Sequence, residues 1–162
     1  SDINKKIPNK EFDFVKTNLF GAVNVIKSYT KLHNKNKSKF CSIINISSIY
    51  GVISPDFSIY NKGDRFSPEI YGASKAGLIQ ITKYFSVLLA KKNIIINSIS
   101  PGGILNKDKQ KKSFIKRYSD NVPMQRMAST RDMMTAILMF SSDYSKYTTG
   151  QNLIIDGGLT SK

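Results

Sequence analysis

Residues 40–46 read Phe-Cys-Ser-Ile-Ile-Asn-Ile, a short apolar run rich in β-branched side chains. Such a run is typical of a strand that is buried on both faces. Two similar runs follow along the chain, Ile-Ile-Ile-Asn-Ser-Ile at residues 94–99 and Gln-Asn-Leu-Ile-Ile at residues 151–155. The sequence therefore predicts three buried strands.

Segments with helical spacing of apolar side chains alternate with these strands. They are residues 11–33, 71–92 and 130–141. Strands that alternate with helices are joined by right-handed crossovers and form a parallel sheet with helices on its faces. We therefore expect an α/β fold built as one continuous domain.

Two further segments lack a clear period. Residues 47–70 contain several glycines and prolines and are predicted to form an extended loop. Residues 105–119 are basic and polar, and the sequence is equally compatible with a mobile substrate lid and with a flexible surface loop.

The composition excludes several classes of protein. The chain has 162 residues, of which 40% are hydrophobic and 22% charged, and this excludes a disordered chain or a disulfide-stabilised mini-protein. No apolar run approaches the ~20 residues of a membrane helix, and the first residues show no secretory signal. The single cysteine, Cys41, cannot form an internal disulfide or a multi-cysteine metal site. We expect a soluble, cytoplasmic protein without a metal centre.

A sheet of three parallel strands is thin for such a domain. The apolar strand at residues 40–46 is expected to have a neighbour on each side, because an exposed apolar edge invites aggregation. The chain also begins with Ser1 rather than Met. We therefore expect residues 1–162 to form a single partial domain that is completed by further strands.

The charge balance favours anionic partners. The chain carries 25 Lys and Arg against 11 Asp and Glu, a net charge of +14. Such a charge would suit nucleic acid, a membrane surface or a phosphorylated small molecule, and the basic stretch at residues 107–117 would suit a phosphorylated substrate. The plainer interpretation, a solvated surface in a lysine-rich protein, is favoured because arginine is the preferred reader of phosphates and bases and the cations here are mostly lysines.

Several residues with reactive side chains lie near the carboxyl ends of the predicted strands. Ligands bind at these strand ends in open α/β sheets. Ser48 follows the first strand, and Pro101-Gly102-Gly103 follows the second. Between them a helix opens with Tyr71-Gly72-Ala73-Ser74-Lys75, so that Tyr71 and Lys75 lie one turn apart on the same face. A nearby cation stabilises a phenolate, so this pair suits a tyrosine that acts as a general acid or base.

The order of the motifs carries more information than any one of them, because a Tyr-x-x-x-Lys pair arises by chance in a chain this rich in lysine. The ordered set is Asn-x-Ser-Ser-x-x-Gly at 45–51, Tyr-x-x-x-Lys at 71–75, Asn-x-x-x-Pro-Gly-Gly-Ile at 97–104, and Thr-Gly-Gln with Asp-Gly-Gly within 149–158. In this order the motifs resemble those of the short-chain dehydrogenase/reductase family over nearly the whole chain.

The resemblance implies a role for each matched residue. Tyr71 matches the catalytic acid or base of the family, and Lys75 matches the lysine that assists it and holds the nicotinamide ribose. Ser48 matches the serine that orients the substrate. Asn18 matches the helix asparagine that holds a water of the proton relay.

The resemblance also implies a cofactor and a reaction. Pro101, Gly102 and Ile104 match the loop beside the nicotinamide and, with Tyr71 and Lys75, are the expected contacts of NAD or NADP. Hydride would pass between the nicotinamide and a carbon of a small alcohol or carbonyl substrate, while Tyr71 moves the proton on oxygen.

The implied fold is a Rossmann-like doubly wound parallel sheet, of which this chain holds only the C-terminal strands and helices. In the family, helices equivalent to residues 11–33 and 71–92 commonly form a bundle between subunits, so a homodimer or homotetramer is expected.

Three departures from the family pattern are visible. The sequence contains no glycine-rich phosphate turn and no cofactor-selecting residue, so NAD and NADP both remain open and this chain alone is expected to be inactive. Asn106 stands where the family usually has threonine. The spacing between Ser48 and Tyr71 is long, and the additional loop around residues 55–63 resembles that of members from bacterial flagellin-modification and sugar pathways. A sugar, sugar phosphate or nucleotide sugar is therefore the expected substrate.

A second hypothesis belongs to another class. The chain would then be a non-catalytic protein that keeps the fold and binds anions, including nucleic acid, on its basic face. Steep salt dependence of nucleic-acid binding would distinguish it from the enzyme. The enzyme remains the favoured interpretation.

Overall fold

The computed structural model describes residues 8–36, 40–61 and 66–162. Within these ranges the strands are β1 (Cys41–Ile46), β2 (Ile94–Pro101) and β3 (Asn152–Ile155). They form one parallel sheet in the order β1-β2-β3, with β2 in the centre. All three strands form where they were predicted, but only β2 is buried throughout: β1 ends in the exposed Ile46, and the residues of β3 are half-buried. β2 continues beyond its predicted end because its last residues pair with β3.

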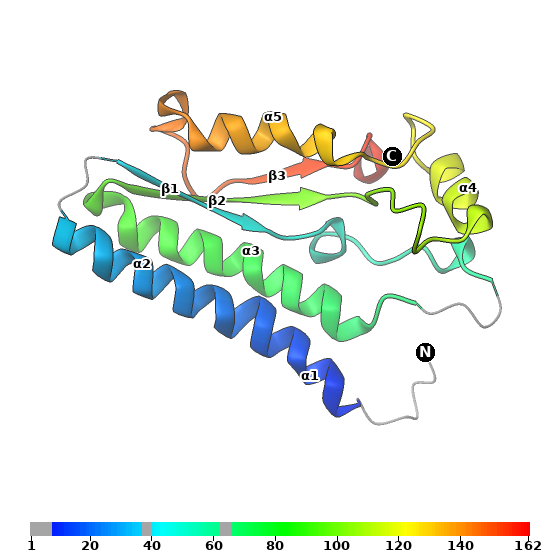
Figure 1. Ribbon diagram of the computed structural model, residues 1–162, viewed down its shortest axis with the longest axis horizontal. Coiled ribbons are helices and arrows are strands. Elements are labelled where there is room, and N and C mark those ends of the chain that lie inside the picture. Colours follow the sequence, from blue (N-terminus) through cyan, green and yellow to red (C-terminus); the bar gives the residue numbers. More distant parts are fainter. Residues whose placement is uncertain (1–7, 37–39, 62–65) are drawn as a thin grey trace.

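Helices cover both faces of the sheet (Figure 1). A long rod made of α1 (Asn9–Val15), a π-helical segment (Lys16–Gly21) and α2 (Ala22–Asn36) lies beside α3 (Glu69–Leu89) on one face. On the other face lies α5 (Thr130–Ser141). This three-layer arrangement is the Rossmann-like α/β fold expected from the sequence.

The core consists of an apolar layer on each side of β2, whose eight residues are all buried. On one side Ile96 packs with Ile26 of α2 and Phe85 of α3. On the other side Ile99 packs with Phe140 of α5. Burial of each such side chain contributes about 1.5–3 kcal/mol to the free energy of folding. Because side chains of β2 pack on both faces of the sheet, the central strand holds both helical layers against it.

The segment after β2 differs from the prediction. Residues 112–119 belong to a helix, α4 (Lys112–Asn121), so a flexible loop over these residues is wrong. Phe114, Tyr118 and Val122 recur every four residues and form one apolar stripe, which packs on Ile59. Of the lysines in this segment, Lys112 and Lys116 lie on the exposed face of the helix.

No described helix combines the length and the apolarity that crossing a lipid bilayer requires. Likewise, no group of three or more metal-binding side chains gathers anywhere in residues 8–36, 40–61 and 66–162.

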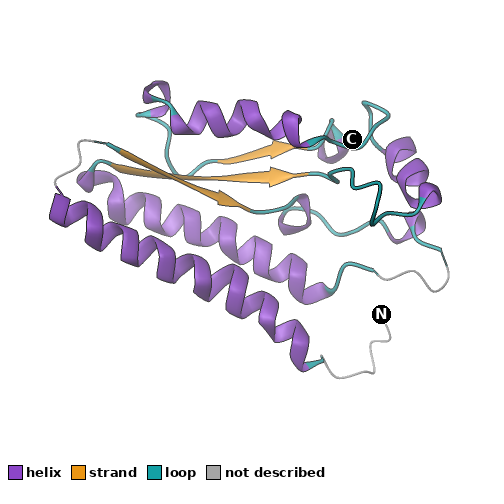
Figure 2. Ribbon diagram, in the orientation of Figure 1, coloured by secondary structure: helices purple, strands orange, loops and turns teal. Residues whose placement is uncertain are grey.

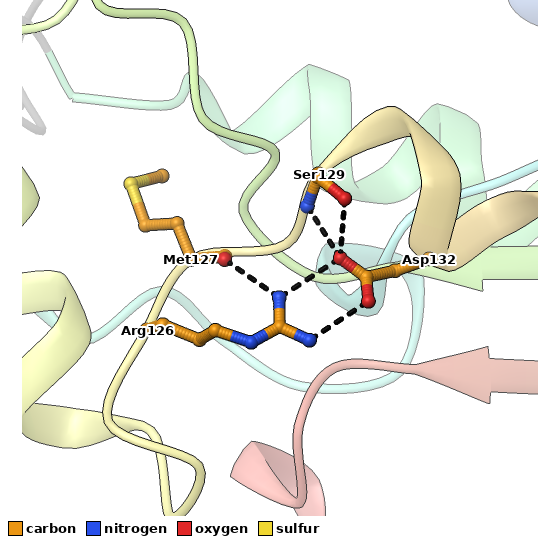
Figure 3. A network of polar contacts seen from close by, with 4 residues as sticks. All are labelled: Arg126, Met127, Ser129 and Asp132. Carbon is orange, nitrogen blue, oxygen red and sulfur yellow. Dashed lines mark hydrogen bonds and ion pairs between the residues drawn. The ribbon is translucent and has the colours of Figure 1, made fainter.

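An ion pair braces the segment that joins α4 to α5 (Figure 3). Arg126 donates from both terminal nitrogens to the carboxylate of Asp132, each at 2.8 Å, and Nη1 also donates to the carbonyl of Met127 at 3.2 Å. The same carboxylate accepts hydrogen bonds from the backbone N–H and the hydroxyl of Ser129, at 2.6 and 2.7 Å. Asp132 thereby caps the start of α5 and holds the preceding segment against it.

This brace extends to the loop that follows β2. Ala128 donates its N–H to the carbonyl of Gly103 at 2.9 Å, and its own carbonyl accepts from the N–H of Leu105 at 2.8 Å. Ile104 and Ala128 form an isolated parallel bridge. The position of the loop at residues 102–105 therefore depends on the segment that Arg126 and Asp132 fix.

We predict that Asp132→Asn lowers Tm by about 2–4 °C at pH 7, because an amide cannot replace the two acceptor oxygens. The Arg126 guanidinium, with Ser129, holds the pKa of Asp132 well below its usual value. The ionised carboxylate thus stabilises the folded protein above the unfolded pKa of ~3.9, and this stabilisation is lost as pH falls toward the lower folded pKa. Thermal unfolding between pH 7 and pH 2 should show the difference between the two proteins shrinking below pH 4.

Asp120→Asn is the matched control. Its ion pair with Lys116, at 2.7 Å, joins two largely exposed side chains within α4, and solvent screens such pairs. This variant should shift Tm by less than about 1 °C. A difference between wild type and Asp132→Asn that does not change with pH would contradict the assignment.

Candidate active site

The segments that follow β1 and β2 meet at one edge of the sheet, where both strands end (Figure 2). They border a cavity of about 210 Å³. Ser48, Tyr71 and Gly102 all line this cavity. The structure thus brings together predicted site residues from a strand end, a helix start and a second strand end.

Ser48 is held by the turn that begins at the end of β1. Its hydroxyl accepts a hydrogen bond from the N–H of Tyr50 at 3.2 Å, which caps the short helical turn Ile49–Gly51. The preceding residue, Ser47, donates its N–H to the carbonyl of Ile99 at 2.7 Å and its hydroxyl to the carbonyl of Lys75 at 2.8 Å. The serine pair therefore connects β1 to both β2 and α3.

Tyr71 and Lys75 lie on one face of the first turns of α3, as the sequence predicts. The Nζ atom of Lys75 is 5.8 Å from the centre of the Tyr71 ring. It donates to the carbonyl of Ile46, the last residue of β1, at 2.8 Å. Burial lowers the pKa of Lys75 from its ordinary value. On its other side, the Tyr71 ring packs edge-on against Phe14 of α1, with ring centres 5.7 Å apart.

Two glycines allow α3 to approach the turn after β1 at backbone contact. A Cβ atom on Gly51 would lie 2.7 Å from the carbonyl carbon of Lys75, and one on Gly72 would lie 2.9 Å from the carbonyl oxygen of Tyr50. A methyl group at either place would push the helix away. Gly51 was part of the quoted motif, but its role as a contact with α3 was not predicted.

Asn18 does not line the cavity and reaches Tyr71 through another residue. It lies in the π-helical segment that interrupts the single helix predicted over residues 11–33. Its Nδ2 donates to the hydroxyl of Ser74 at 2.9 Å, and that hydroxyl donates to the carbonyl of Tyr71 at 2.7 Å. A π-helical turn is rare and commonly marks a functional site.

The predicted cofactor loop is only partly at the cavity. Gly102 borders it, whereas Pro101 is the buried last residue of β2 and Ile104 pairs with Ala128. Asn106 stands where the family usually has threonine. Its side-chain oxygen accepts hydrogen bonds from the backbone N–H groups of Asp108 and Lys109.

Sequence reasoning missed several residues of the cavity wall. Tyr50 and Tyr60 come from the segment that was predicted only as a loop, and Phe114 and Tyr118 come from α4. The apolar stripe of α4 was a usable signal for the last two residues. Tyr60 carries no local pattern that connects it to the site.

The chain's own residues fit one end of a nicotinamide dinucleotide. An ammonium group has three N–H donors, and Lys75 uses one of them on Ile46, so two remain for ribose hydroxyls. Gly102 lets backbone border the cavity beside Tyr71. Nothing in the printed sequence matches the glycine-rich turn that holds the pyrophosphate.

Comparisons with known proteins agree with this geometry. The matching family model is described as Enoyl-(Acyl carrier protein) reductase and covers residues 5–160. The NADH-dependent L-xylulose reductase of Ambrosiozyma monospora is 33% identical over 153 residues, which is 91% of this chain and 53% of the reductase. Post-translational flagellin modification protein A of Campylobacter coli is 34% identical over 122 residues, 75% of this chain and 47% of that protein. The chain spans about half the length of these relatives.

A solved structure supports the same relationship. The short-chain dehydrogenase of Leptospira borgpetersenii serovar Hardjo-bovis (strain JB197) with bound NAD+ shares 36% identity and superimposes with a TM-score of 0.88, over 99% of this chain and 60% of that one. Together with the matching family model and the ordered Ser48, Tyr71 and Lys75 motifs, this shows that the chain belongs to the short-chain dehydrogenase/reductase family.

Proposed function

We propose that this chain carries the substrate and proton-transfer part of an NAD(P)-dependent oxidoreductase that interconverts an alcohol and a carbonyl compound. The observation that carries the proposal is the shared cavity of Ser48 and Tyr71, with the ammonium of Lys75 beside the Tyr71 ring. Residues 1–162 are proposed to be the C-terminal part of a larger dinucleotide-binding domain. The coverage of the relatives, about half their length, supports this.

When bound, the nicotinamide supplies hydride to the substrate carbon or accepts it from that carbon. In the direction of reduction, the phenolic hydroxyl of Tyr71 gives its proton to the carbonyl oxygen, so that an alcohol forms. The hydroxyl of Ser48 hydrogen-bonds the same oxygen and orients it. Once Tyr71 has given up its proton, the ammonium of Lys75 stabilises the resulting phenolate. The remaining N–H groups of Lys75 hold the ribose of the cofactor.

Asn18 acts as a positioning residue in this proposal. Through Ser74 it fixes the carbonyl of Tyr71 at the first turn of α3. Its place in a proton relay, which the family resemblance implies, is part of the same proposal.

The proposed substrate is a sugar or a related polyol. One relative supports this by name, the NADH-dependent L-xylulose reductase. A phosphorylated sugar has less support, because the lysines at 107–112 are exposed and none of them lines the cavity.

We further propose that the protein works in the cytoplasm as a homodimer or homotetramer. The outer surface of α2 and α3 exposes large apolar side chains that a second copy would cover. These side chains are Val25, Tyr29, Leu32, Tyr84, Val87 and Leu88. Val87 is the most exposed of them, at 82%.

Replacing Tyr71 with Phe should reduce turnover at least ~100-fold, because the ring keeps its packing but loses the proton donor. Turnover is measured by NADH or NADPH absorbance with a panel of ketoses, using the protein as its gene encodes it. Binding of the dinucleotide should persist. Tyr84→Phe is the control, since Tyr84 lies on the same helix with its side chain exposed. Full activity of the Tyr71 variant would refute the assignment.

Replacing Val87 with Asp should shift the protein toward the monomer, because a buried carboxylate at a subunit interface has no partner. Light scattering coupled to size-exclusion chromatography measures the mass. Tyr144→Asp is the control, because Tyr144 is fully exposed but lies away from α2 and α3. An unchanged mass for the Val87 variant would exclude this surface as the interface.

A further inference from the structure

The wall of the active-site cavity is unusually rich in aromatic side chains. Tyr50, Tyr60, Tyr71, Phe114 and Tyr118 all line it. The cavity measures about 210 Å³, below the ~300–1,000 Å³ of sites that hold drug-sized ligands. A cavity of this size can hold a single ring against these aromatic side chains.

Three of these rings form a continuous set. The ring centres of Tyr60 and Phe114 lie 5.6 Å apart, and those of Phe114 and Tyr118 lie 5.9 Å apart. We call Tyr60, Phe114 and Tyr118 the ring set. Two of its members come from α4 and one from the segment after Ile59, so its shape depends on how these segments are joined.

Polar contacts join the two segments. Arg117 of α4 donates from Nε to the carbonyl of Ile59 at 2.7 Å, and Asn121 donates to the carboxylate of Asp56 at 3.3 Å. Tyr118 is itself anchored, because its hydroxyl oxygen accepts the N–H of Gly103 at 2.6 Å. These three hydrogen bonds therefore fix the ring set, two of them to backbone atoms and one between side chains.

The polar side chains that line this cavity are neutral: the hydroxyls of Ser48 and of the tyrosines, and the amide of Gln110. Burial raises the pKa of Tyr50 and of Tyr118, so both phenols keep their protons at neutral pH. Since the oxygen of Tyr118 already accepts a hydrogen bond, its proton is left to donate. The hydroxyls of Tyr50 and Tyr60 face each other at 3.5 Å, and only one of their two protons can serve that contact.

No charged side chain is found among the described residues that line the cavity. The ammonium of Lys75 is directed to the carbonyl of Ile46. An anionic substrate would lose its hydration without gaining a cationic partner from the described part of the wall, and this desolvation is costly. An uncharged ring can place its apolar face against the ring set and its hydroxyl oxygens against the phenol protons.

We propose that Tyr60, Phe114 and Tyr118 select an uncharged, single-ring substrate and disfavour its anionic counterpart. This inference rests on the proposed oxidoreductase function and names the substrate class of the same site. Phe114 supplies the central ring face, and the phenol hydroxyls supply the polar contacts.

The test measures equilibrium binding of two probes that differ in charge, cyclohexanone and 4-oxocyclohexanecarboxylate, by ligand-observed NMR. Both are measured with and without NAD+, which cannot reduce a ketone, so binding is read without turnover. We expect cyclohexanone to bind at least about tenfold more tightly than the carboxylate. Equal or tighter binding of the carboxylate, or no binding of cyclohexanone, overturns the proposal.

Variants locate the binding surface. Phe114→Leu should weaken cyclohexanone binding about three- to tenfold, since a ring contact is lost while an apolar side chain remains. Phe57→Leu is the matched control, because Phe57 packs on Phe66 and does not line the cavity. Tyr60→Leu provides a second test within the ring set if Phe114→Leu fails to fold. Equal effects of the Phe57 and ring-set variants would overturn the proposal.

The two hypotheses fail in different ways. If the ring-set variants bind cyclohexanone as well as the wild type does, while Tyr71→Phe still reduces turnover as predicted, only the substrate class is refuted. Full turnover of Tyr71→Phe refutes the oxidoreductase mechanism, and the charge preference of the cavity is then still decided by the binding measurement.

Discussion

The close approach of α3 to the turn after β1 is the constraint on which the site depends. Only hydrogen atoms fit between the backbones at Gly51 and Gly72, because a Cβ at either residue would lie within 3 Å of backbone atoms across the contact. Ser48 precedes this turn, while Tyr71 and Lys75 flank Gly72 on the helix. Two residues without side chains therefore set how far the hydroxyl of Ser48 lies from the Tyr71 phenol. The packing of the two backbones, more than side-chain contacts, therefore positions Ser48, Tyr71 and Lys75.

Much of the fold could be predicted because its signals are local. The apolar run of β2 and the helical spacing of α3 each follow from which faces are buried, and both were predicted within a few residues. The helix α4 was missed because polar and charged residues outnumber its apolar residues, although Phe114 and Tyr118 keep helical spacing. The π-helical segment was missed for a different reason: its neighbours have ordinary helical sequence, and nothing in the period shows the widened turn.

The site was predicted where motifs stand next to strand ends and missed where distant segments meet. Ser48, Tyr71 and Gly102 were predicted to lie together because parallel strands end at the same edge of a sheet. Side chains in the segments that follow those ends are therefore close in space. Tyr60 stands in a loop, and only tertiary packing against α4 brings it to the cavity. The strong positive charge, in contrast, does not extend to the described lining of the cavity, since a net charge describes the whole surface and not one cavity.

The widened turn at Lys16–Gly21 has a consequence for how the long helical rod can change. A π-helical turn holds one more residue than an α-helical turn, so the two halves of the rod are out of phase. The first half directs Phe14 toward the Tyr71 ring, and the second directs Ile26 into the sheet core. The rod thus consists of two differently phased helices on one axis, and substitutions beside the Tyr71 ring do not have to preserve the face that packs on the sheet core.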